Sequence, residues 1–180
     1  MLLISDRKDK AAGAAGRHVK QLLLILLLWG TAVAHAAQPV YRVDVAAPMK
    51  VAYDQLYRSL EERRLWVVFE ADTGRNLEGM AKRLGDDYNR NGLQGIRSMV
   101  VCNAWYANRV SNLDPDMLAL CPLRVTVVHK DGNSRLLFAR RSVQAADSPA
   151  LPVVREIEAE VIGAIDEAAR LALQAKSEGN

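Results

Sequence analysis

Alternating apolar and polar positions predict strands in two parts of the chain, and a turn motif predicts a third. Residues 40–46 and 123–128 place every second apolar side chain on one face, as half-buried strands do. Residues 135–140 follow the turn formers "KDGNS", which predicts a hairpin. Residues 65–69 are continuously apolar, and we expect them to form a central strand. Residues 96–101 are expected to form a further strand.

Helical spacing marks two longer segments and one short one. Pro48 opens a helix, a position at which its missing N–H is tolerated. Pro152 opens a longer helix with a buried stripe of Val154, Ile157, Val161, Ile165 and Ala168. A short helix is expected over 77–84, ending at Gly85. Residues 71–76 and 86–95 are expected to be loops.

The order of these elements defines a fold class. It is β-α-β-β-β-β-α, with a minor helix in the second connection. Short links around the fourth and fifth strands favour antiparallel pairing. We therefore expect an α+β protein in which an antiparallel sheet of about five strands has its helices packed on one face.

The segment before residue 40 has a different pattern. Residues 22–28 ("LLLILLL") begin an apolar run, basic residues precede it, and "AHA" closes it at Ala36. This succession is typical of a secretory signal peptide, and the core is shorter than the ~20 apolar residues of a membrane span. We expect a signal peptide over 1–36, cleavage near Ala36, and a single periplasmic or secreted domain over 37–180 without a stable membrane anchor. An uncleaved anchor is the alternative.

Removal of the leader also changes the charge. The full chain has 24 Lys and Arg against 21 Asp and Glu. Five of the basic and two of the acidic residues lie in 1–36, so the remaining domain has nineteen of each sign. A neutral domain gives no reason to expect nucleic acid or an anionic membrane as a partner.

Motifs for catalysis or cofactor binding are absent from the sequence. It has no phosphate-binding loop, no dinucleotide fingerprint and no G-x-S-x-G around a serine. His129 follows the fourth predicted strand and could join Cys102 and Cys121 as a metal ligand, but no ligand-pair spacing supports such a site. We expect no metal, no cofactor and no catalytic residues, and an enzymatic function is left open.

The two cysteines, Cys102 and Cys121, do not form a C-x-x-C motif, so thioredoxin-like exchange lacks its usual sequence basis. An oxidising compartment permits a disulfide. If the third and fourth strands are antiparallel neighbours, both cysteines lie at the same end of the sheet, whereas parallel strands would separate them by ~20 Å. We predict a structural disulfide, with two buried free thiols as the alternative.

The stretch around these cysteines resembles the family known as domain of unknown function 302. Its members tend to carry Asn-Pro after a strand, and then a Leu-Pro-Leu-like step into a strand that ends in an acidic or Gly turn. Asn103 matches the Asn, and Pro122 and Leu123 match the step. Ala104 stands where the family often has Pro, and the Asp-His-Ala-like segment of some members is missing. The resemblance extends from about Tyr41 to the final helix and implies an antiparallel sheet with helices on one side, but no common reaction.

We interpret the chain as an exported small-ligand-binding or accessory protein, with an unidentified small molecule or envelope protein as partner. A long helix across a curved sheet can leave a cleft for a ligand. The candidate ligand contacts are Asn103, Trp105, Tyr106 and Arg109, which combine aromatic surface with a cation. The alternative is that Trp105 and Tyr106 are core residues of a short helix and that Arg109 is solvated.

Two other functions stay open. The protein could be a thiol-redox protein in which Cys102 is the reactive thiol, because a cysteine at the start of a helix can have a lowered pKa. The chain could also be a structural envelope protein that acts through a partner surface.

Overall fold

The computed structural model describes residues 38–178, and the predicted signal peptide with its cleavage site lies outside them. The strands are β1 (Val40–Val45), β2 (Trp66–Asp72), β3 (Gly95–Cys102), β4 (Leu123–Lys130) and β5 (Asn133–Ala139). The helices are α2 (Met49–Glu62), α3 (Thr73–Glu78), α4 (Ala81–Leu84), α5 (Ala104–Leu113) and α6 (Leu151–Glu178). Short 3-10 turns lie at η1 (Gly85–Asp87), η2 (Pro115–Leu120) and η3 (Arg141–Val143).

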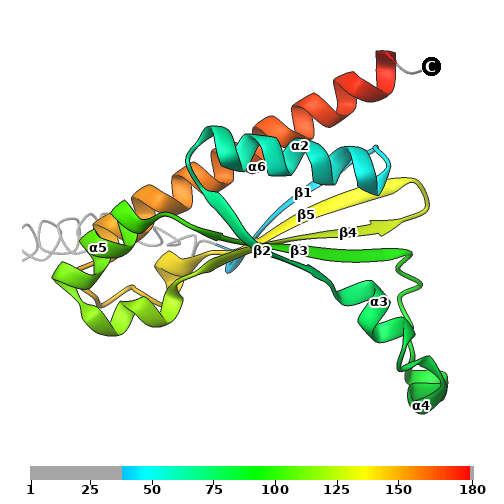
Figure 1. The fold of residues 1–180 in the computed structure, drawn as a ribbon, viewed down its shortest axis with the longest axis horizontal. Coiled ribbons are helices and arrows are strands. Elements are labelled where there is room, and N and C mark those ends of the chain that lie inside the picture. The colour runs from blue at the N-terminus through cyan, green and yellow to red at the C-terminus, as the bar shows by residue number, and fades with distance from the viewer. Residues whose placement is uncertain (1–37, 179–180) are drawn as a thin grey trace, which may run out of the picture. The chain divides into compact units, whose positions relative to one another are not determined.

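The five strands form one antiparallel sheet in the order β1-β5-β4-β3-β2. A tight turn joins β4 to β5, with positive φ at Asp131 and Gly132. Helices α2 and α6 lie together on one face of the sheet (Figure 1). The predicted α+β fold class, five antiparallel strands with helices packed on one face, is confirmed.

The main core lies between this sheet face and the two helices. Alternate strand residues fill it, because successive side chains of a strand point to opposite faces. Phe138 and Leu136 of β5 are buried against Leu56 of α2 and Ile165 of α6. The stripe predicted for the last helix is confirmed, since four of its five residues are buried and Ile157 is partly buried. Helix α6 begins at Leu151, one residue before the predicted start.

The prediction of a central strand over 65–69 is wrong, because β2 is an edge of the sheet. Trp66, Val68 and Phe69 are 51%, 59% and 61% exposed, and the register with β3 shifts between Val67 and Phe69. A short apolar run looks the same whether one or both of its edges are paired, so its composition could not reveal this position. The N–H of Val67 is bonded instead to the Glu61 carboxylate of α2, at 2.8 Å.

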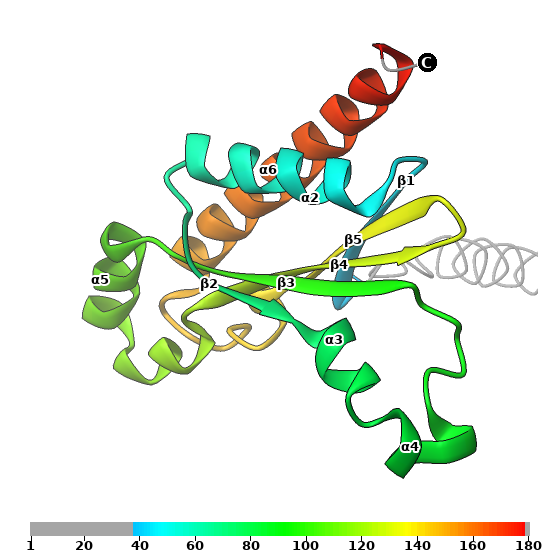
Figure 2. The ribbon, with the colours of Figure 1, turned by 45° about the vertical axis from the view of Figure 1, so that its right-hand side comes forward.

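The prediction of a loop over 71–76 is also wrong. Strand β2 continues to Asp72, and α3 begins at the next residue. The Asp72 side chain caps this helix by accepting a hydrogen bond from the Arg75 N–H at 2.9 Å. The helix expected over 77–84 is divided between α3 and α4, which lead away from the sheet (Figure 2).

The sequence predicts a helix between β3 and β4 only in the alternative interpretations of Trp105, Tyr106 and Cys102. The structure has two elements in this segment. These are α5 and η2, and each begins at a polar cap, Asn103 and Asp114. Val110 of α5 packs with residues from the start of α6 in a second, smaller apolar cluster. This cluster anchors α5 to α6 at the end of the sheet where both cysteines lie.

Candidate functional site

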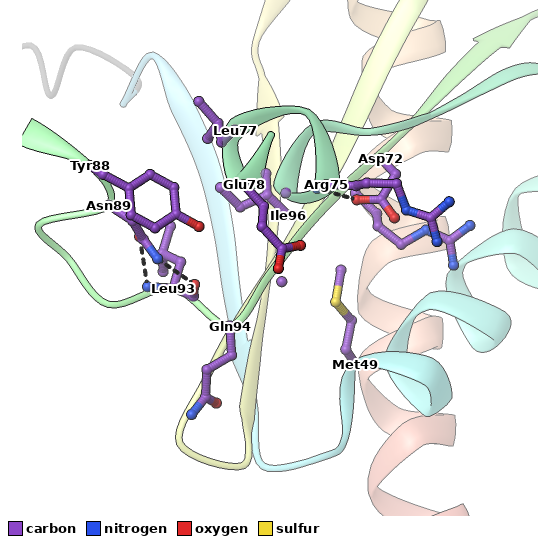
Figure 3. Close-up of a pocket in the computed structure, with 13 residues that line it drawn as sticks. Met49, Asp72, Arg75, Leu77, Glu78, Tyr88, Asn89, Leu93, Gln94 and Ile96 are labelled. Carbon is purple, nitrogen blue, oxygen red and sulfur yellow. Dashed lines mark hydrogen bonds between the residues drawn. The ribbon is translucent and has the colours of Figure 1, made fainter. Parts of the chain in front are cut away.

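A polar cavity of about 420 Å³ opens at the far end of β3 from the cysteines. Its walls come from the start of α2, from α3, from residues 88–94 and from the first residues of β3 (Figure 3). The start of α2, α3 and the continuous segment 88–97, which are distant from one another in the sequence, therefore meet around one space. Cavities of this size are typical of small-molecule sites.

Helix α3 supplies the charged wall. Its cap at Asp72 fixes where the helix starts, and Gly74 lets it lie close to β3, since a Cβ at this position would be 3.1 Å from the Ile96 nitrogen. Figure 3 shows the Glu78 side chain pointing into the cavity and the Arg75 side chain extending past Asp72, away from Glu78. The approach of α3 to the strand thus brings charges of both signs to the cavity.

The opposite wall is the segment 88–94, which local hydrogen bonds hold in shape. The Asn89 amide donates to the Leu93 carbonyl at 2.7 Å and accepts from the Leu93 N–H at 2.9 Å (Figure 3). Gln94 ties the segment to the β4–β5 hairpin, because its N–H donates to the His129 carbonyl and its side chain accepts from the Asp131 N–H. This wall is therefore preformed, although it contains no regular element.

The base of the cavity depends on a glycine. Gly95 begins β3, and a Cβ at this position would collide with the Met49 sulfur. The glycine allows the first side chain of α2 to lie directly against the strand. Met49 consequently adds a polarisable contact to the other apolar lining residues, Leu77, Leu93 and Ile96.

Arg97 is a fixed cation at the edge of this cavity. Its guanidinium lies 4.0 Å from the centre of the Tyr53 ring, and its Nη2 is 3.5 Å from a Glu70 oxygen. The Tyr53 hydroxyl donates to the same Glu70 carboxylate. Burial, together with this hydrogen bond to Glu70, raises the pKa of Tyr53 above its ordinary value, so the phenol stays protonated. Glu70 balances the charge of Arg97.

Arg75 and Glu78 differ from Arg97 because their charges have no partner. Within residues 38–178, neither side chain forms a hydrogen bond or ion pair, although both line the cavity. A cation and an anion are thus available to a ligand in the same space. Hydrogen bonds to ionised groups are among the stronger polar contacts in proteins.

The predicted contact Asn103 has a structural role. Its Oδ1 accepts from the N–H groups of Trp105 and Tyr106 at 3.0 and 3.2 Å, and its Nδ2 donates to the Arg64 carbonyl at 2.9 Å. These bonds cap α5 and join it to the chain that leads into β2. All polar groups of this amide are therefore engaged with the backbone.

The other three predicted contacts lie together on α5. Arg109 lies 4.3 Å from the centre of the Trp105 ring, which meets the Tyr106 ring edge-on. Glu156 of α6 accepts from the Tyr106 hydroxyl at 3.3 Å and lies 2.8 Å from Arg109. Burial and Glu156 raise the pKa of Tyr106. Trp105 is exposed, so it is not the core residue of the alternative interpretation.

The space beside this cluster is small. An apolar hollow lined by Asn103 and Tyr106 has a volume of about 30 Å³, room for a water or two. Trp105 and Arg109 do not line it. The four predicted residues are therefore gathered around α5 but do not enclose a ligand-sized cavity.

The two cysteines lie at one end of the sheet, as antiparallel pairing of β3 and β4 predicts. Both thiols are free and partly buried. Burial raises the pKa of the Cys121 thiol, and the neighbouring Cys102 thiol raises it further. His129 lies at the opposite end of β4, about 25 Å away at the usual rise per strand residue. His129 is therefore too far from Cys102 and Cys121 for the three side chains to bind one metal ion.

Metal-binding clusters and membrane-spanning helices are both absent from residues 38–178. No group of three or more His, Cys, Asp or Glu side chains is placed to bind a metal ion. In the same part of the chain, no helix combines the length and the apolar character needed to span a membrane.

The fold and the cavity define the class of protein: a small antiparallel α+β domain with a polar cavity at one end of its sheet. The chain belongs to the family described as Domain of unknown function DUF302, whose model matches residues 41–168. The crystal structure of an uncharacterized conserved DUF302 protein from Bacillus stearothermophilus is similar, with a TM-score of 0.64 and 21% identity, over 73% of this chain and 99% of that one. At this identity the likeness shows the fold alone. No curated protein matches the chain.

The polar cavity was missed by sequence reasoning. Asp72 could have been recognised as a helix cap, because an Asp directly before a helical segment is a common start signal. That signal would have placed Arg75 and Glu78 on a helix. It would not have shown that residues 88–94 fold back to face them.

Proposed function

We propose that the protein is an exported small-ligand-binding protein and that its ligand occupies the cavity between α3 and β3. The observation that carries this proposal is the pair of unpartnered, opposite charges, Arg75 and Glu78, on a cavity of about 420 Å³. Charged side chains that already form an ion pair with each other would contribute little to the affinity for a ligand. Here a ligand would gain hydrogen bonds to ionised groups without first breaking an ion pair.

The ligand that fits this arrangement is a small zwitterion. Its anionic group would meet Arg75, and its ammonium group would meet Glu78. The Met49 sulfur and Leu93 supply limited apolar contact for a short side chain. Free α-amino acids have this chemistry, and they are the probes with which to test the proposal.

Replacing Arg75 with glutamine should weaken binding of the best-bound amino acid about tenfold, because one hydrogen bond to an ionised group is lost. Isothermal titration calorimetry on the purified protein measures this change. Arg83→Gln is the matched control, since this exposed arginine of α4 does not line the cavity and its loss should leave the affinity unchanged.

Two results would contradict the proposal. One is that no free amino acid binds at millimolar concentration to a correctly folded protein. The other is that Arg75→Gln and Arg83→Gln change the affinity equally, which would indicate a general effect of charge.

Export is supported by the basic flank, the apolar run and the "AHA" site before residue 37. Expression of the full chain in a Gram-negative bacterium should yield an envelope-fraction protein whose new N-terminus is near Ala37. Mass spectrometry of the intact protein measures the N-terminus. A protein that retains the leader would show that this part of the proposal is wrong.

A thiol-redox function is a second candidate. The observation that favours it is the contact between Cys102, directly before the cap of α5, and Cys121. Peptide mapping of exported protein without reductant separates this candidate from a structural disulfide, because a redox function needs a free, reactive Cys102 thiol.

A further inference from the structure

The sheet face opposite α2 and α6 has a second hollow, which we name the basic groove. It has a volume of about 1000 Å³, and its cationic lining residues are Arg42, Lys130, Arg135 and Arg140. Arg42 and Arg135 come from β1 and β5, which are hydrogen-bonded neighbours. Their strand neighbours Val43 and Leu136 face the core, so these two arginines face away from it.

A shared carboxylate orients the two arginines. Asp44 pairs with Arg135 in the strand register, and its oxygens accept from the Nε of Arg135 and lie 3.5 Å from the Nε of Arg42. Both contacts use the inner nitrogen of the guanidinium. Among residues 38–178, no hydrogen bond or ion pair occupies the outer nitrogens of either arginine. Asp44 therefore orients both guanidinium groups, and their outer nitrogens are available to donate hydrogen bonds to a ligand.

Lys130 adds a third positive charge. Its Nζ donates to the Asn91 carbonyl at 2.8 Å, which connects the groove to the segment 88–94. Three cations and one carboxylate leave a net charge of two positive units. Arg140, the fourth cation, is balanced by Glu158, to which it bonds at 3.0 Å.

We propose that the basic groove binds a small, multiply charged oxyanion, one that carries phosphate or carboxylate groups. Planar guanidinium forks match the oxygens of such groups in a two-point contact. Asn91 and Leu93 line the same hollow, so a compact anion that contacts the arginines can also contact the segment 88–94. The ligand differs from the zwitterion of the α3 cavity, and the two proposals stand independently.

The test is titration of the purified protein with inorganic pyrophosphate and with citrate, followed by calorimetry at low and at physiological ionic strength. We expect saturable binding of at least one of them and a loss of at least about tenfold in affinity in Arg42→Gln/Arg135→Gln. Arg135→Lys should fall between wild type and the double variant, because it keeps the charge but not the fork.

Arg124→Gln is the matched control. Arg124 is exposed on the same face of β4 but does not line the groove, and its loss should leave the affinity unchanged. Circular dichroism verifies that each variant is folded, and amino-acid binding in the α3 cavity should be retained by all of them.

Three outcomes would overturn the proposal. The first is the absence of saturable binding of both anions to the folded wild-type protein. The second is an equal loss in Arg124→Gln and in the double variant, which would indicate general charge attraction. The third is arginine-dependent binding to vesicles of anionic lipid together with no binding of the soluble anions.

Discussion

Replacing Glu158 with alanine should lower the free energy of unfolding by about 3 kcal/mol. Glu158 is a charged residue of α6 that is only 6% exposed. Its carboxylate accepts from Arg140 at 3.0 Å and from the N–H and hydroxyl of Ser142 at 3.0 and 3.1 Å. Its removal leaves the partly buried guanidinium without a counter-charge and two donors without an acceptor, and each of these costs free energy.

Denaturant unfolding monitored by circular dichroism measures this loss. Glu160→Ala is the control on the same helix, because Glu160 forms an ion pair with Arg63 at 3.0 Å but in an exposed setting. Exposed pairs contribute about 0 to 1 kcal/mol. Equal losses in the two variants would contradict the buried network as the source of stability.

The second large effect is expected from the cysteines. In protein purified from an oxidising compartment, Cys102 and Cys121 should be joined, and their reduction should lower the free energy of unfolding by about 3 kcal/mol on the chain-entropy model. Antiparallel pairing of β3 and β4 places both cysteines at the same end of the sheet, near enough for the Cys102 thiol to raise the pKa of the Cys121 thiol. The 3-10 turn η2 and α5 lie inside the loop that the bond would close.

Peptide mapping without reductant identifies the link, and melting temperatures before and after reduction measure its effect. The double variant Cys102→Ser/Cys121→Ser should be insensitive to reductant. Two free thiols in exported protein would show that the structural disulfide is wrong. If Cys102 alone then reacted rapidly near neutral pH, the result would favour the thiol-redox function.

The sequence patterns predicted the main elements because the burial of side chains has a clear period in each of them. The stripe of α6 and the alternation of β4 are examples, and both contribute to the confirmed core. Strand β2 shows the limit of this reasoning. Phe69 and Trp66 are apolar and yet exposed, so their composition favoured a central strand that the topology does not provide.

The candidate site was harder to predict than the fold. The predicted contacts lie on α5 because this segment combines a Trp-Tyr pair with an arginine, and such residues are common in binding sites. The structure uses them in contacts with one another and with Glu156. The α3 cavity instead joins Met49, Glu78 and residues 88–94, whose proximity depends on how the whole sheet is assembled.

The hydrogen bond between Glu61 and the Val67 N–H has a consequence for solubility. An edge strand with free backbone donors and apolar side chains is a template onto which another chain can add a strand, the first step of many aggregation reactions. The Glu61 carboxylate occupies one donor of β2, the N–H of Val67, and places a negative charge at this edge. A second chain would have to displace this carboxylate before it could pair at that position, so α2 protects the edge from intermolecular strand addition.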